Sequence, residues 1–137
     1  MFTDITKKIQ KFILKNSQWL ANIYSPHSTC FFFQNENKLL HLLDIGYFLD
    51  KLAPYAKQFK VEDKNIKYLH NMIYLRNDVP ADELTNGQSE IRSLFLNSSE
   101  NIPIQKSKLL LGELKRIFFV ELHPMRDRKL IITFVKG

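Results

Sequence analysis

Cysteine, glycine and proline are all scarce: the 137-residue chain has one cysteine, four glycines and five prolines. The single thiol, Cys30, excludes an internal disulfide and any Cys-x-x-Cys zinc or redox motif. With a hydrophobic fraction of 45%, the low glycine and proline counts are typical of a folded chain rather than a disordered one. We therefore expect a single domain over residues 1–137, with an apolar core large enough to need no metal or disulfide.

Long apolar runs are also lacking. No stretch reaches the roughly 18 apolar residues that cross a bilayer, and the N-terminus, MFTDITKKIQ, does not carry the apolar segment of a signal peptide. We therefore expect a cytoplasmic protein that makes no membrane contact.

Motifs that carry chemistry are missing as well. The sequence has no Gly-rich phosphate loop, no nucleophile elbow and no paired acidic motif. Of the four histidines, His41 could share a helical face with Asp44 and take His70 as a third ligand, but nothing else shows ligand spacing. We expect no enzyme, no cofactor and no metal site.

Hydrophobic periodicity predicts a mainly helical (α+β) fold. Apolar residues recur at helical spacing from Ile5 to Ile23, while the aromatic run at 30–33 indicates a short buried strand. Another helix is predicted over 37–52, and Asp63 is expected to cap a further one. This helical N-terminal part would cover residues 1–77, and the turn-forming residues at 77–87 would separate it from the rest.

The order of elements in residues 86–137 predicts a winged-helix-like part. Helices are expected over 88–98 and 103–117, the second opened by Pro103. After this helix the spacing of apolar residues changes to that of extended strands. Residues 118–122 and 129–135 are therefore predicted to form a C-terminal β-hairpin. Helix, turn, helix and hairpin is the order of a winged helix-turn-helix, whose second helix enters the major groove of DNA.

Positive charge supports that interpretation. The chain has a net charge of +6, and residues 103–137 carry eight basic against three acidic side chains. A basic surplus concentrated at one end favours an anionic partner. The residues expected to bind double-stranded DNA are Lys106, Ser107, Lys108 and Lys115 on the helix and Arg126, Arg128 and Lys129 on the hairpin.

The C-terminal segment LKRIFFVELHPMRDRKLIITFVKG resembles the recognition-helix end and wing of MarR-type regulators. The similarity is carried by Leu114, 119–121, 127–129, Thr133 and Gly137. It implies that Arg128 and Lys129 are wing residues near the DNA backbone or minor groove, with Asp127 bracing the arginine. Phe118 departs from the pattern, because that family usually has a glycine there.

The favoured function is therefore a small DNA-binding regulator, or a plasmid or phage accessory factor, acting as a homodimer on a two-fold operator. The alternative is a protein-interaction module such as an adaptor, an inhibitor or a subunit of a larger complex. Its basis is an abundance of aromatic residues beyond the needs of one core, at 31–33, Tyr47, Phe48 and Tyr55. A third explanation of the positive charge is that the basic hairpin is exposed to water and binds no partner.

Overall fold

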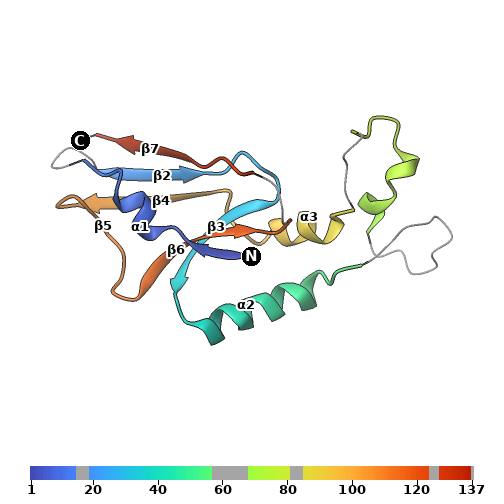
Figure 1. Cartoon of the computed structure of the whole chain (residues 1–137), viewed down its shortest axis with the longest axis horizontal. Coiled ribbons are helices and arrows are strands. Elements are labelled where there is room, and N and C mark those ends of the chain that lie inside the picture. Colours follow the sequence, from blue (N-terminus) through green and yellow to red (C-terminus); the bar gives the residue numbers. More distant parts are fainter. Residues whose placement is uncertain (15–18, 57–67, 81–84, 124–126, 137) are drawn as a thin grey trace.

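Two antiparallel β-sheets form the body of the molecule in this computed structural model, which describes residues 1–14, 19–56, 68–80, 85–123 and 127–136 (Figure 1). One sheet has the strand order β1-β6-β3 and the other β5-β4-β2-β7. The bounds are Phe2–Asp4 for β1, Leu20–Tyr24 for β2, Cys30–Glu36 for β3, Ser99–Gln105 for β4, Lys108–Leu109 for β5, Lys115–Glu121 for β6 and Ile131–Val135 for β7.

Helices are few within the described residues. The longest is α2, Leu39–Leu52, which follows β3 directly and runs along the β1-β6-β3 sheet (Figure 1). The short helix α3, Gly87–Ser93, lies beyond the end of β6 (Figure 1). The remaining pieces are α1, Thr6–Gln10, and two single 3₁₀ turns, η1 (Leu69–Asn71) and η2 (Ile73–Leu75).

The β1-β6-β3 sheet is buried on both faces because alternate side chains of its strands enter two different cores. Phe32 of β3 and Ile117 of β6 pack with Ile23 and Ile102 of the other sheet. Their strand neighbours Phe31 and Val120 point the opposite way and pack with Leu49 of α2 and with Leu122. The molecule is therefore layered as sheet, sheet and helix, with a core on each side of the central sheet.

The mainly helical fold expected from the sequence is wrong, since the structure is an α+β fold built mostly of strands. Within the described part of the helix predicted from Ile5 to Ile23, only α1 is helical, and the segment from Leu20 onward is strand β2. Ala21 and Ile23 are fully buried there, and this alternation has the two-residue period of a strand. The strand at 30–33 and the helix at 37–52 are confirmed as β3 and α2.

The helix predicted over 103–117 is also wrong, because this segment ends β4, forms β5 and begins β6. Both C-terminal strands exist, but they do not form a hairpin: β6 pairs with β1 and β3, whereas β7 pairs with β2 in the other sheet. The helix predicted at 88–98 is present in shortened form as α3. The helix expected to start at Asp63 begins outside the described residues, and from Tyr68 onward it is wrong, because Leu69 and Ile73 lie in two single 3₁₀ turns.

A strained two-residue turn joins β4 to β5. Gln105 pairs with Lys108, so Lys106 and Ser107 are the two turn residues, and their φ values are +50° and +59°. Positive φ at both positions is the type I′ geometry, which normally selects Asn-Gly. The side chain of Gln10 holds the turn, donating from Nε2 to the carbonyl of Ser107 (2.8 Å) and accepting at Oε1 from the amide of Leu109 (3.1 Å).

Replacing Ser107 by glycine removes a side chain from a left-handed position, and we expect Ser107→Gly to raise the free energy of unfolding by about 1 kcal/mol. Urea denaturation followed by circular dichroism measures the change. In the control Ser99→Gly, the glycine enters a regular strand and lowers the free energy of unfolding instead. A destabilised Ser107→Gly variant would contradict the strain argument.

Candidate functional site

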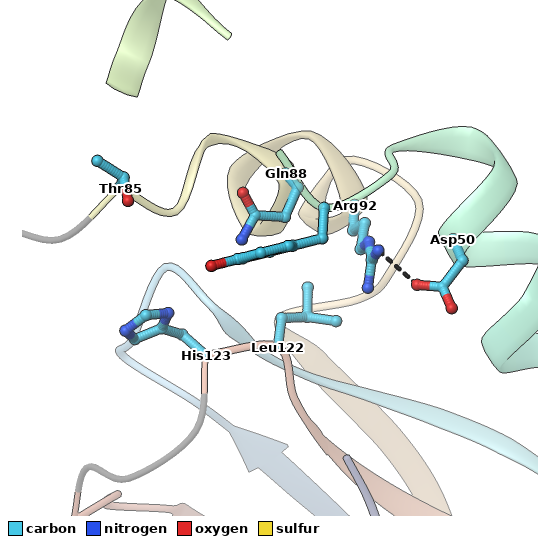
Figure 2. Close-up of a pocket in the computed structure, with 7 residues that line it drawn as sticks. Asp50, Thr85, Gln88, Arg92, Leu122 and His123 are labelled. Atoms are coloured by element: carbon cyan, nitrogen blue, oxygen red, sulfur yellow. Dashed lines mark hydrogen bonds and ion pairs between the residues drawn. The ribbon is translucent and has the colours of Figure 1, made fainter. Parts of the chain in front are cut away.

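A cavity of about 440 Å³ lies where α3 meets the C-terminal end of α2 and the end of β6 (Figure 2). We call it the α3 pocket. Its volume falls within the range of about 300–1,000 Å³ that small-molecule sites occupy. Figure 2 shows Thr85 and Gln88 on one side of the space, and His123 and Leu122 on the opposite side. The full lining is Asp50, Tyr55, Thr85, Gln88, Arg92, Leu122 and His123.

The guanidinium of Arg92 ties α3 to the end of α2. Its Nε and Nη2 donate to the carbonyl of Ala53 at 3.0 and 2.8 Å, and Nη2 also donates to Asp50 Oδ1 at 2.6 Å. The last carbonyls of a helix have no intrahelical partner, so a buried cation at this position satisfies one of them and favours the helix dipole. Arg92 therefore forms the rigid back wall of the pocket.

Gln88 stands next to this wall with an unsatisfied acceptor. The residue is buried, and its Oε1 atom lacks a hydrogen-bond partner among the described residues. A buried carbonyl oxygen without a partner costs about 1–3 kcal/mol. Buried polar atoms without a partner are rare in folded proteins, so Oε1 of Gln88 is a candidate acceptor for a donor group from outside the chain.

The first turn of α3 is fixed by contacts to two other segments, the end of β6 and the turn η1. Ser89 Oγ donates to the carbonyl of Leu122 at 2.9 Å, and the amide of Gly87 donates to Asn71 Oδ1 at 2.9 Å. A Cβ atom at Gly87 would lie 2.5 Å from Cβ of Tyr68, so only glycine allows this approach. The pocket wall is thus positioned by backbone and side-chain contacts rather than by α3 alone.

A chain of polar groups runs along the other side of α3. His70 Nε2 lies 2.9 Å from Asn86 Oδ1, Asn86 Nδ2 donates to Glu90 Oε1 at 3.1 Å, and Ser28 Oγ donates to the same oxygen at 3.3 Å. The Glu90 carboxylate can only accept, which fixes the orientation of the Asn86 amide. His70 therefore carries its proton on Nε2 and donates to Asn86.

A buried ion pair lies immediately below the pocket. Arg128 binds both carboxylate oxygens of Glu121 through Nε and Nη2, and Nη2 also donates to Thr29 Oγ1 and the carbonyl of His123, both at 3.2 Å. The two side chains are only 12% and 18% exposed. The amide of His123 donates to Glu121 Oε1 at 2.9 Å, so the pair holds the backbone that carries His123 into the pocket.

These contacts shift the pKa values of three groups. Burial raises the pKa of the Glu121 carboxyl, but hydrogen bonds from Arg128, His123 and Cys30 outweigh it and leave the pKa below 4.5. The hydrogen bond to Glu121 raises the pKa of Arg128. Burial and then the Glu121 carboxylate raise the pKa of Cys30 to about 12, and its Sγ donates to Glu121 Oε2 at 3.3 Å.

The model of the UPF0047 YjbQ-like proteins matches residues 1–137, the whole chain. The chain belongs to this family. A UPF0047 protein of Archaeoglobus fulgidus is 29% identical over 129 residues, covering 94% of this chain and 86% of the relative. A UPF0047 protein of Methanothermobacter thermautotrophicus is 29% identical over 133 residues, covering 95% and 79%.

Solved structures agree with the assignment to the UPF0047 family. A yjbq/upf0047 family protein of Clostridium acetobutylicum superposes with a TM-score of 0.74 at 26% identity, covering 98% of this chain and 91% of that one. A hypothetical protein of Aeropyrum pernix gives a TM-score of 0.77 at 23% identity, covering 99% and 89%, and therefore supports the fold alone.

Membership of the UPF0047 family corrects the winged-helix interpretation and, with it, the similarity to MarR-type regulators. The segment predicted as the DNA-binding helix contains parts of three strands. The two strands of the predicted wing belong to different sheets. The DNA-binding regulator is therefore wrong as a function for this chain. The protein-interaction module that stood as its alternative gains no support from the family either.

The residues expected to bind DNA do not gather in one place. Lys106 and Ser107 form the β4–β5 turn, and Lys108, which follows the turn, lines a cleft beside α1 together with Lys115. Lys115 and Glu121 stand at opposite ends of β6, about 20 Å apart at the rise of an extended strand. The predicted wing residues lie at the Glu121 end: Arg128 is buried against Glu121, Lys129 is exposed, and Arg126 is outside the described residues.

One signal for the site is present in the sequence. Glu121 is an acid inside an apolar strand. Buried charges are normally paired, so it indicated a partner elsewhere in the chain. Arg92 gave no such signal, because it lies beside the apolar face of the helix predicted over 88–98 and not on it. Gln88 gave no such signal, because a neutral amide is ordinary on a helix surface.

Two further properties concern the described residues. None of their helices combines the length and apolarity that crossing a membrane requires. No group of three histidine, cysteine, aspartate or glutamate side chains among them is arranged to hold a metal ion, and His41, Asp44 and His70 are not such a group.

Glu121→Gln should strongly destabilise the protein, because it leaves the buried Arg128 charge without its partner. We expect the free energy of unfolding to fall by about 3 kcal/mol at pH 7. The folded pKa of Glu121 lies below the unfolded value of 4.5, so its contribution is complete above pH 4.5 and is lost as the pH falls through the folded pKa. Urea titrations at pH 7 and at about pH 3 measure this.

The difference in the free energy of unfolding between the wild type and Glu121→Gln should therefore be smaller at acidic pH than at pH 7. Glu113→Gln, at an exposed position in the turn before β6, is the matched control and should change little at either pH. A difference that does not depend on pH would show that the effect is not electrostatic.

Cys30 should be inert in the folded protein, because its side chain is fully buried and its pKa is about 12. We expect dithiobis(nitrobenzoate) at pH 8 to react at least about 10³-fold faster in 6 M urea than with the native chain. Absorbance at 412 nm follows the reaction. Rapid native labelling would contradict the burial of this thiol.

Proposed function

We propose that the chain binds a small, neutral organic molecule in the α3 pocket. The observation that carries this proposal is the unpartnered, buried Oε1 atom of Gln88 in the pocket wall. A ligand with an N–H or O–H donor would satisfy it, and the gain would be large because the acceptor is shielded from water.

The charge of the lining supports a neutral ligand. Asp50 and Arg92 are the charged residues among the lining side chains, and they already neutralise each other at 2.6 Å. An anion would have to compete with Asp50 for Arg92, and a cation would have to break the same pair. Either exchange gives up a partly buried charge-assisted hydrogen bond.

The apolar part of the lining supports a planar ligand. Tyr55 is 62% exposed although it lines the cavity, so a face of its ring is accessible. Aromatic rings favour offset or edge contacts with other rings, worth about 0.5–1.5 kcal/mol beyond the area that they bury. With Leu122 as an apolar floor, an aromatic amide combines the flat body and the N–H donor that the pocket requires.

The expectation of no catalytic centre stays a prediction for this chain.

Benzamide is a suitable probe because it has one aromatic ring and one neutral amide. Titration into ¹⁵N-labelled protein should shift the resonances of the Gln88 side-chain amide and of neighbouring backbone amides. Gln88→Leu keeps the bulk of the side chain and removes the acceptor, so we expect benzamide to bind at least about tenfold more weakly.

The same substitution should have the opposite effect on stability. Removing an unsatisfied buried acceptor should raise the free energy of unfolding by about 1 kcal/mol. Gln105→Leu, at an exposed position of β4, is the matched control and should change neither property. If Gln88→Leu destabilises the protein, the amide has a structural role and the proposal fails. Benzamide shifts confined to another region would also contradict it.

A further inference from the structure

A second cleft, of about 680 Å³, lies between α1 and the segment that leads from β5 into β6. We call it the α1 cleft. It contains Lys115, at the opposite end of β6 from Glu121, and shares no lining residue with the α3 pocket. Its volume is also within the range of about 300–1,000 Å³ that small-molecule sites occupy. The two cavities are therefore separate sites.

Hydrogen bonds fix both walls of the α1 cleft. The side chain of Gln10 joins α1 to the β4–β5 turn and to the amide of Leu109. Thr6 Oγ1 accepts from the amide of Ile117 at 2.8 Å, which joins the start of α1 to β6. Figure 1 shows α1 close to β5 and to the connection between β5 and β6. The cleft is thus formed before any ligand binds, so binding does not have to order its walls.

Four basic side chains from three segments line the cleft: Lys7 of α1, Lys108 of β5, and Lys115 and Arg116 at the start of β6. In the described part of the chain, the ammonium groups of the three lysines form no ion pair. A cleft lined by charges of one sign concentrates ions of the opposite sign. The lining therefore favours an anion.

Two of these cations are positioned by the turn before β6. Nη1 of Arg116 donates to the carbonyls of Lys115 and Glu113 at 2.8 and 3.3 Å, which fixes the plane of the guanidinium. The amide of Lys115 donates to the carbonyl of Gly112 at 2.9 Å. The side chain of Lys115 then runs past Gly112, where a Cβ atom would lie 3.6 Å from its Cγ. Cations that are held in place bind an anion at a smaller entropic cost than free ones.

The acids of the cleft do not cancel this charge. Asp4 already accepts from the amide of Thr6 at 2.9 Å and from Asn37 Nδ2 at 3.2 Å. Glu113 is exposed and forms no ion pair within the described residues. Four basic and two acidic side chains leave an excess of two positive charges. A phosphate monoester, with a charge of about −1.5 to −2 at pH 7, matches this excess better than a single carboxylate does.

An apolar surface adjoins these cations. Leu109 and Leu111 line the cleft and are only partly buried, and both pack against the core that contains Ile9 and Ile117. Ligand sites combine a few placed polar groups with such apolar walls, which bind the organic part of a ligand.

We propose that the α1 cleft binds a small organic phosphate ester. The phosphate contacts Lys7, Lys115 and Arg116, and the organic part lies against Leu109 and Leu111. This is a second site, and it does not rest on the binding of a neutral molecule in the α3 pocket.

Phenyl phosphate is a suitable probe because it joins one phosphate to one apolar ring. Titration into ¹⁵N-labelled protein at about pH 7.5 and 50 mM salt should shift the backbone amides of Leu109, Gly112 and Arg116. The side-chain amide of Gln88 should not shift. Inorganic phosphate lacks the ring and phenol lacks the charge, so each should bind at least about fivefold more weakly. Binding of phenyl phosphate should also weaken as the salt is raised to about 500 mM.

The double variant Lys7→Gln/Lys115→Gln removes two of the cations that line the cleft, and we expect it to bind phenyl phosphate at least about tenfold more weakly. Lys8→Gln/Lys11→Gln is the matched control: it removes as many positive charges from exposed positions that do not line the cleft. Its affinity should change less than about twofold. All four positions are exposed, so circular dichroism should show that both variants are folded.

Equal losses in the two double variants would overturn the proposal, because they would show a general attraction to a basic protein. Shifts that are absent or that lie outside the α1 cleft would do the same, as would inorganic phosphate that binds as tightly as phenyl phosphate. The shifted amides belong to the α1 cleft, so none of these results depends on whether benzamide binds near Gln88.

Discussion

Burial of the β1-β6-β3 sheet on both faces is the constraint that positions the second sheet, α2 and the α3 pocket. Strand β3 sends Phe32 into one core and Phe31 into the other, and β6 does the same with Ile117 and Val120. A sheet that is apolar on both sides needs a layer on each, and the chain supplies the second sheet and α2. Since α2 follows β3 directly, its end falls near the end of β6, where the α3 pocket lies.

The pocket is held by polar contacts to backbone carbonyls at the places where strands and helices end. Arg92 donates hydrogen bonds to the carbonyl of Ala53, at the C-terminal end of α2. Ser89 donates one to the carbonyl of Leu122, just after β6. Carbonyls at the ends of helices and strands lack regular hydrogen-bond partners. By binding two of them, α3 is held in place, although so short a helix would not be stable by itself. Two buried amide atoms at this helix are left without a partner among the described residues: Oε1 of Gln88 in the pocket wall, and Nδ2 of Asn71, which binds the first turn through its oxygen.

The sequence was sufficient for elements whose signal is local. The aromatic run at 30–33 and the long apolar helix at 37–52 were predicted correctly because their composition and length leave few alternatives. The segment at 103–117 was misassigned because the turn at Lys106 and Ser107 contains neither glycine nor asparagine. Its conformation depends on Gln10, almost a hundred residues earlier, and no local pattern reveals that support.

The pairing of the strands could not be deduced either. Both 118–122 and 129–135 look like neighbouring strands of a hairpin, and a hairpin is the default when two strands follow closely. The buried Glu121–Arg128 pair lies between them and accompanies a change of sheet instead. Arg128 was predicted to lie at the DNA backbone or minor groove with Asp127 bracing it, whereas its acid partner is Glu121, seven residues away. The same holds for the candidate site: the sequence shows its charged residues, but it does not show which residues they pair with.

The contact between Gly87 and Tyr68 has a consequence for how this chain can diverge. A Cβ atom at position 87 would lie 2.5 Å from Cβ of Tyr68, an atom that every residue except glycine carries. Changing the tyrosine to another side chain therefore does not make room for a mutation of Gly87. One of the two backbone segments must move, or position 68 must become glycine, so the two positions constrain each other in evolution.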